Sequence, residues 1–215
     1  MDNIISFLKG LFGKNTEVVV PQEPVTFGKV LSVTYNTQRD NKHRPGGSCN
    51  VTSVQMCLSL GSKVTDDELF ERANSKAMQD WVSKRNPHIY DPQIQQGNLN
   101  IVWDVLEKIA RDEIGVEYAK HWEPGLSWDL FKAKLIAEIE QGYPIVVGGR
   151  FTASGHIIAI VGYNENGFVC HDPYGVAPDY TNHNGAYVTY GYDYMKAKLS
   201  TRHLFIHADR RIPIS

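Results

Sequence analysis

The sequence predicts an α+β domain in which the helices come first and an antiparallel sheet follows. Four segments before Gly142 repeat apolar residues at helical spacing, and after Pro144 the chain changes to short apolar runs typical of strands. At 215 residues, the chain can fold as one domain with a sizeable core and short appendages.

The four predicted helices are recognised by their apolar spacing and, in three cases, by a capping signal. They cover residues 49–60, a stretch beginning at residue 65, residues 100–110 and residues 128–141. The last helix has the clearest ends, because Ser127 can cap its first turn and Gly142 follows its final residue.

Three strands are expected after the last helix, over residues 145–149, 156–163 and 168–172. The Asn-Glu-Asn-Gly sequence between the second and the third is a hairpin turn signal, so these two strands should pair in antiparallel fashion. Residues 186–195 and 202–208 are expected to supply further strands or edges.

Residues 1–15 are predicted to form an amphipathic helix, and residues 16–30 a linker to the main domain at residues 31–215. The apolar face of this helix is expected to pack on the domain, on a partner chain or on a membrane surface. The start carries Asp2 instead of a basic cluster, so it does not resemble a secretion signal. We therefore expect synthesis in the cytoplasm without a signal peptide, with no prediction of the site of action.

Composition argues against several classes of function. The formal net charge of -2 gives no strong positive field that would attract nucleic acid, so no nucleic-acid partner is expected. The three cysteines are too few for a disulfide framework and are expected to be reduced thiols. The histidines match no zinc spacing, so no metal and no other cofactor is expected.

Cys49 follows a Gly-Gly-Ser turn at the start of the first predicted helix. The unpaired N–H groups and the dipole at a helix start favour the thiolate, which is the nucleophilic form of cysteine. The same N–H groups can stabilise an oxyanion on an attacked carbonyl. A lone cysteine at a helix start is more often structural, so the catalytic interpretation requires a base. Cys57 and Cys170 are predicted to be core thiols.

His156 begins one strand of the predicted hairpin, and Asp172 ends the other. An antiparallel hairpin brings the end of its second strand back beside the start of its first, so we expect the two side chains to be neighbours. A base oriented by an acid is the pair that a nucleophilic cysteine requires. Taken alone, each residue also has a structural interpretation, as a polar strand end or a turn cap.

Together these segments resemble the papain-like cysteine peptidases of the C39-like family, of bacterial and phage type. The resemblance spans residues 32–175 and rests on "TQRDN", "CNVTSVQMCLSLG", "QGYPIVVGG" and "GHIIAIVGYNENGFVCHDPYG". It implies a papain-like fold with a helical lobe and an antiparallel sheet lobe. It also implies roles for four residues: Cys49 as nucleophile, His156 as general base and acid, Asp172 as the acid that orients it, and Gln38 as a donor to the oxyanion. This chain has Asn50-Val51 where relatives commonly have Gly-Pro. The difference affects the shape of the first helical turn but removes no reacting group.

The resemblance implies a thiol-dependent hydrolase that cleaves peptide or amide bonds through an acyl-thioester. Peptides are the expected substrates, including the cell-wall peptides that an endolysin cleaves in peptidoglycan. Two alternatives stay open. One is a thiol acyltransferase of the phytochelatin synthase-like type, and the other is a catalytically inert C39-like binding module.

Overall fold

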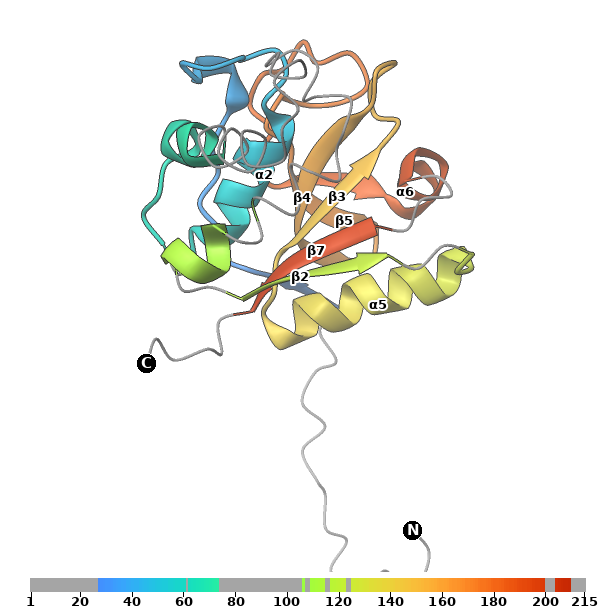
Figure 1. The fold of residues 1–215 in the computed structure, drawn as a ribbon. Coiled ribbons are helices and arrows are strands. Elements are labelled where there is room, and N and C mark those ends of the chain that lie inside the picture. Colours follow the sequence, from blue (N-terminus) through green and yellow to red (C-terminus); the bar gives the residue numbers. More distant parts are fainter. Residues whose placement is uncertain are drawn as a thin grey trace, which may run out of the picture.

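An antiparallel sheet of seven strands lies at the centre of the fold (Figure 1). The structure is a computed structural model that describes residues 27–60, 62–73, 106, 109–114, 117–122, 125–199 and 204–209. The predicted N-terminal helix and most of the predicted helix at residues 100–110 lie outside the described residues, as does Gly61. The predicted α+β class, with helices packed on an antiparallel sheet, is confirmed.

The seven strands come from the whole length of the domain. They are β1 (Gly28–Val30), β2 (Glu117–Trp122), β3 (Ile145–Gly149), β4 (His156–Asn164), β5 (Gly167–His171), β6 (Val188–Gly191) and β7 (Leu204–Asp209). Their order across the sheet is β2-β7-β3-β4-β5-β6, and β1 pairs with β4. All of these pairings are antiparallel.

Strand β4 is buried on both faces. Ile157, Ala159 and Val161 belong to one apolar cluster of the core, whereas Ile158 and Ile160 belong to a second. Successive side chains of a strand point to opposite faces of the sheet, so the two clusters lie on opposite sides. Burial on both sides explains why the sequence of this strand is a continuous apolar run. The Asn-Glu-Asn-Gly turn joins β4 to β5, as predicted.

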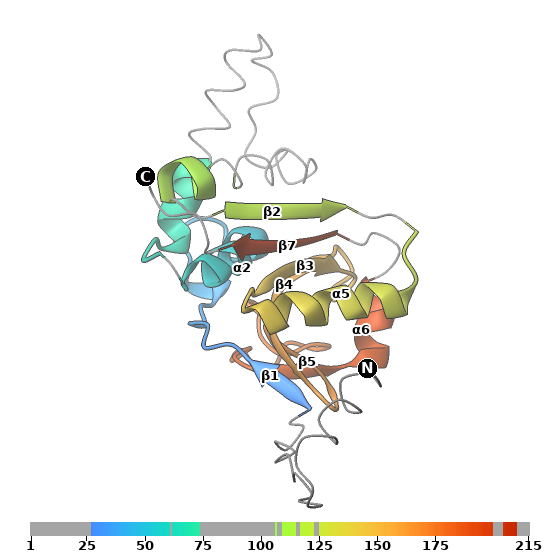
Figure 2. The ribbon, with the colours of Figure 1, turned by 90° about the horizontal axis from the view of Figure 1, so that it is seen from below.

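Helix α2 (Cys49–Leu58) packs on one face of the sheet (Figure 2). Its buried apolar side chains, among them Val51 and Val54, join the same cluster as Ile157 of β4. The Ser53 hydroxyl donates a hydrogen bond to the Ile157 carbonyl oxygen at 3.1 Å. This contact fixes the first turns of α2 beside the beginning of β4, where His156 is located.

Helices α5 (Trp128–Gln141) and α6 (Tyr192–Leu199) pack on the opposite face of the sheet. On α5, Phe131, Leu135 and Ile139 are buried at a spacing of four residues, which places them on one side of the helix. The ends of α5 agree with the prediction. The Ser127 side chain accepts a hydrogen bond from the first turn, and Gly142 adopts a left-handed conformation with φ of 92°.

The shorter helical elements are the 3₁₀ turn η1 (Gln38–Asp40), a helix over residues 66–73 and the π-helical turn η4 (Ala110–Ile114). The helix over residues 66–73 follows Thr65, whose hydroxyl oxygen accepts a hydrogen bond from the Glu68 N–H at 3.2 Å, as the capping box predicts. Among the described residues, no helix is long and apolar enough to cross a membrane.

Three elements differ from the predictions. Gly28–Val30 were assigned to the linker but form β1, so the folded region begins before residue 31. Glu117–Trp122 form β2 inside the half predicted to be helical, and Tyr192–Leu199 form α6 where a strand or edge was expected. Strands β1 and β2 pair with strands far away in the sequence, so their formation depends on tertiary contacts that a local pattern does not reveal.

Candidate active site

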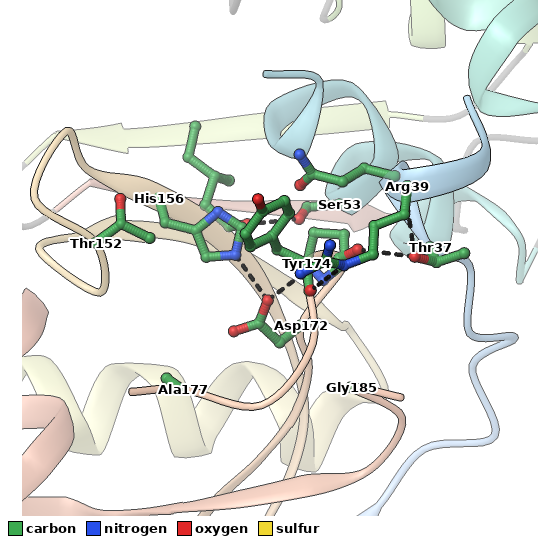
Figure 3. A network of polar contacts seen from close by, with 12 residues as sticks. Thr37, Arg39, Ser53, Thr152, His156, Asp172, Tyr174, Ala177 and Gly185 are labelled. Carbon is green, nitrogen blue, oxygen red and sulfur yellow. Dashed lines mark hydrogen bonds and ion pairs between the residues drawn. The ribbon is translucent and has the colours of Figure 1, made fainter. Parts of the chain in front are cut away.

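The structure brings His156 and Asp172 together at one end of the β4–β5 hairpin (Figure 3). The His156 Nε2 atom lies 2.7 Å from Asp172 Oδ1, and both side chains are buried. The pairing register places Ala159 opposite His171, after a bulge between Ile160 and Gly162. Asp172 follows the last paired residue and is therefore diagonal to His156, a separation that the two side chains span.

Cys49 lies close enough to His156 to affect the pKa of the imidazole. Burial lowers the pKa of His156, but the hydrogen bond with Asp172 and the interactions with Cys49 and with the charge of Asp172 outweigh burial and raise the pKa to about 9. The protonated imidazolium is therefore favoured while its two partners are negatively charged. Such an arrangement allows a histidine to hold a proton beside a cysteine thiolate.

Cys49 is the first residue of α2 and is partly exposed. Its position depends on a buried network beneath the first helical turn. The Asn41 side-chain amide donates hydrogen bonds to the hydroxyls of Ser48 and Thr52, both at 2.9 Å, and the Thr52 hydroxyl donates to Asp66 Oδ2 at 2.9 Å. The network connects the loop before Cys49 to the helix that follows α2.

Gln38 lies in η1, and its side chain is buried. Its Nε2 donates to the Pro45 carbonyl oxygen at 2.9 Å, and its backbone N–H donates to the Pro173 carbonyl oxygen at 2.9 Å. Gln38 therefore connects the segment before Cys49 to the segment after Asp172. Among the described residues, the buried Oε1 atom of this side chain has no hydrogen-bond partner.

Asp172 has more partners than the sequence indicated. Oδ1 also accepts a hydrogen bond from the Tyr174 N–H at 3.0 Å, and Oδ2 accepts one from the Tyr190 hydroxyl at 2.9 Å. The Tyr190 hydroxyl in turn accepts a hydrogen bond from the Ala177 N–H at 2.9 Å. Gly185 packs so closely that a Cβ there would lie 2.0 Å from the Asp172 carbonyl oxygen. The loop after Asp172 thus holds the carboxylate in place.

Tyr190 was not among the residues predicted from the sequence. It lies in β6, which pairs with β5, and no local motif connects it to Asp172. Tyr174 and Tyr180 were missed as well, although their rings lie edge-on to the His156 ring at centroid distances of 6.1 and 5.8 Å. The "DPYG" sequence that follows β5 contained the only local signal for Tyr174, because a turn after Asp172 returns the next residues toward the histidine.

Replacing Tyr190 by phenylalanine is expected to lower kcat/KM about tenfold, because a hydrogen bond to a charged group is lost while the ring stays packed. The matched control is Tyr192→Phe, which removes a hydroxyl that donates to the Asn164 carbonyl oxygen at the far end of the hairpin. Both variants are compared by steady-state kinetics and thermal melting. Full activity of Tyr190→Phe would show that Asp172 does not need this donor.

Cys49 is expected to react with iodoacetamide much faster than the two other free cysteines. Cys57 and Cys170 are buried, and burial raises the pKa of both thiols, so little thiolate is exposed at either position. Peptide mapping of the alkylated protein against time measures the three rates, with urea-unfolded protein as the control in which the sites react alike. Equal rates in the folded protein would contradict an accessible, activated Cys49.

His171 lies next to Asp172 in the sequence but outside the cluster. Its Nδ1 accepts a hydrogen bond from the Tyr187 N–H at 3.1 Å, and its Nε2 lies 2.9 Å from the Val33 carbonyl oxygen. Burial lowers its pKa, in keeping with a neutral ring that holds the neighbouring loops. Within the described part of the chain, no group of three or more histidine, cysteine and acidic side chains is placed to hold a metal ion.

Comparison with known proteins identifies the family of the chain. Residues 30–198 match the Peptidase_C39 like family. The fold is similar to the crystal structure of a Bacillus anthracis protein described as a C39-like peptidase, with a TM-score of 0.52 and 15% identity, over 86% of this chain and 99% of that chain.

A second similar structure is UfSP from C. elegans, with a TM-score of 0.47 and 13% identity, over 89% of this chain and 35% of that chain. No curated protein matches the sequence. The family match covers well over half of the chain, from β1 to α6, and includes Cys49, His156 and Asp172. The chain therefore belongs to the Peptidase_C39 like family.

Proposed function

We propose that this chain is a cysteine peptidase in which Cys49 is the nucleophile, His156 the general base and acid, and Asp172 the group that orients His156. One observation carries the proposal: a partly exposed thiol at a helix start lies close enough to affect the pKa of a histidine whose ring is hydrogen-bonded to a buried carboxylate. This is the nucleophile, base and orienter arrangement that covalent catalysis by cysteine requires. Membership of a peptidase family supports an amide bond as the target.

In the proposed reaction, the Cys49 thiolate attacks the carbonyl carbon of the scissile amide, and the carbonyl oxygen takes the negative charge. The C–N bond then breaks as His156 gives its proton to the leaving amine, and the acyl group stays on sulfur as a thioester. A water molecule next loses a proton to His156 and attacks the thioester. This step releases the carboxylic acid and restores the thiolate and the imidazolium.

We assign the oxyanion hole to the Gln38 side-chain amide and the Cys49 backbone N–H. The N–H groups of the first helical turn have no acceptor within the helix, which leaves the Cys49 N–H available. The Gln38 amide is buried and anchored to the Pro45 carbonyl oxygen, so it would not need to reorganise during the reaction.

As substrates we propose peptides, and we select the cell-wall peptides of peptidoglycan, as for an endolysin, as the first to be tested. The supporting observation is family membership, which concerns peptide cleavage in general. The experiment incubates the wild-type protein and Cys49→Ala with purified peptidoglycan and, separately, with a peptide library. Products are read by mass spectrometry.

New termini that appear with the wild type but not with Cys49→Ala would establish peptide hydrolysis and identify the cleaved bond. Products in which the acyl group is joined to an added amine or thiol would indicate acyl transfer. No product in either mixture, together with binding of peptides by Cys49→Ala, would indicate an inert binding module and contradict the proposal.

A further inference from the structure

We propose that Arg39 binds a carboxylate of the peptide on the leaving-group side of the scissile bond. This inference rests on the proposed peptidase function and adds a substrate preference to it. The carboxylate is either an acidic side chain or a free C-terminus, because both offer the same pair of oxygens. Arg39 follows Gln38 in η1, so the turn that holds the proposed oxyanion donor also places this cation beside the site.

The Arg39 guanidinium is held in one orientation before any ligand binds. Its Nε donates to the Tyr174 carbonyl oxygen at 2.7 Å, and its Cζ lies 3.9 Å from the centroid of the Tyr174 ring. A hydrogen bond and a cation–π contact therefore fix both the position and the plane of the group. A side chain ordered in advance loses less conformational entropy on binding.

Within the described part of the chain, no partner contacts the two Nη groups of Arg39. Among the described residues, no ion pair joins Arg39 to a carboxylate, and its hydrogen bonds are made by Nε and by the backbone N–H. The side chain is partly buried. A carboxylate can accept hydrogen bonds from a guanidinium in a bidentate pair, and partial burial makes this pair stronger than on an open surface.

The position of Tyr174 indicates the side of the substrate that reaches Arg39. The Tyr174 ring lies edge-on to the His156 ring at 6.1 Å, and the Tyr174 N–H donates to Asp172 (Figure 3). As the proposed general acid, His156 must lie beside the leaving amine. The Arg39 guanidinium lies over the Tyr174 ring, and this ring lies beside His156. The substrate residues nearest to Arg39 are therefore those that follow the scissile bond.

The test uses internally quenched peptides that carry either aspartate or asparagine at each position around the cleaved bond, and peptides that end in a free carboxylate or an amide. For the wild type, we expect kcat/KM to be about tenfold higher for the acid than for the amide at one leaving-group position, the size expected for a charged hydrogen-bonded pair. In Arg39→Gln the ratio of the acid rate to the amide rate should fall to about one, whatever the change in the rate for the amide peptides. The aspartate and C-terminal series distinguish the two sources of the carboxylate.

Arg72→Gln removes an exposed arginine from the helix over residues 66–73 and is the matched charge control; it should keep the preference. Arg39→Lys keeps the charge and should keep part of the ratio. An equal loss for acid and amide peptides in Arg39→Gln would show that Arg39 only supports the loop and would overturn the inference. A preference confined to the acyl side would also overturn it.

Binding separates this inference from the proposed function. The same peptide pairs are titrated into Cys49→Ala and into Cys49→Ala/Arg39→Gln, with fluorescence anisotropy as the readout. If no peptide is cut by the wild type, but the acid peptides still bind about tenfold more tightly in an Arg39-dependent manner, the carboxylate site stands and the peptidase function fails. Equal binding of acid and amide peptides would overturn the site.

Discussion

Cys49→Ala is expected to reduce peptide turnover to background, and His156→Ala should be nearly as severe. Removing the thiol removes the only proposed nucleophile, and removing the imidazole ends proton transfer in both halves of the reaction. Losses of about 10⁵–10⁶ in kcat are usual when a nucleophile or its base is removed from a triad. Steady-state kinetics with an identified peptide measures the loss, and circular dichroism confirms that each variant is folded.

The double variant Cys49→Ala/His156→Ala should be no worse than Cys49→Ala alone, because the two groups act as a unit. Cys57→Ala is the matched control. It removes a buried thiol from the same helix, so its kcat per folded molecule should be close to that of the wild type. Turnover by a folded Cys49→Ala protein would overturn the whole assignment.

Asp172→Asn is expected to lower kcat about 10²–10⁴-fold and to move the alkaline limb of the pH profile to lower pH. The hydrogen bond and the charge of Asp172 help to raise the pKa of His156 to about 9, against the effect of burial. The protonated imidazole is needed to protonate the leaving amine, so kcat/KM of the wild type should fall as pH rises through about 9.

With the Asp172 charge removed, burial is opposed by fewer stabilising contacts, and the pKa of His156 falls. The alkaline limb of kcat/KM, measured from pH 5 to pH 10, should therefore move toward neutrality in Asp172→Asn. The control is Asp193→Asn, which neutralises an exposed carboxylate on α6 and should leave the profile unchanged. If the alkaline limb of Asp172→Asn stayed at the pH of the wild-type limb, the pKa of His156 would not depend on this carboxylate.

The part of the site built from local structure could be predicted from the sequence. His156 and Asp172 lie on one hairpin, and the Asn-Glu-Asn-Gly turn fixes how its strands return. The start of α2 at Cys49 was also predictable, because a Gly-Gly-Ser turn precedes an apolar helical repeat. The exact register was not, since a bulge between Ile160 and Gly162 moves Asp172 to a diagonal position.

Features that depend on contacts between distant segments could not be predicted. The Tyr190 hydroxyl reaches Asp172 only because β6 pairs with β5, and the strand pattern does not say which residue of β6 faces the carboxylate. Likewise, nothing near Arg39 in the sequence indicates that Tyr174 will lie beneath its guanidinium. Such contacts follow from the packing of loops, which local propensities do not determine.

The hairpin that carries His156 and Asp172 makes the two parts of the site depend on contacts of very different range. These two residues are only 16 apart in the chain, so their contact closes a short loop. The Ser53–Ile157 bond, which fixes α2 beside β4, joins residues 104 apart. The pairing of the histidine with its carboxylate therefore depends on a single hairpin, whereas the position of the thiol relative to that pair depends on the packing of α2 against the sheet.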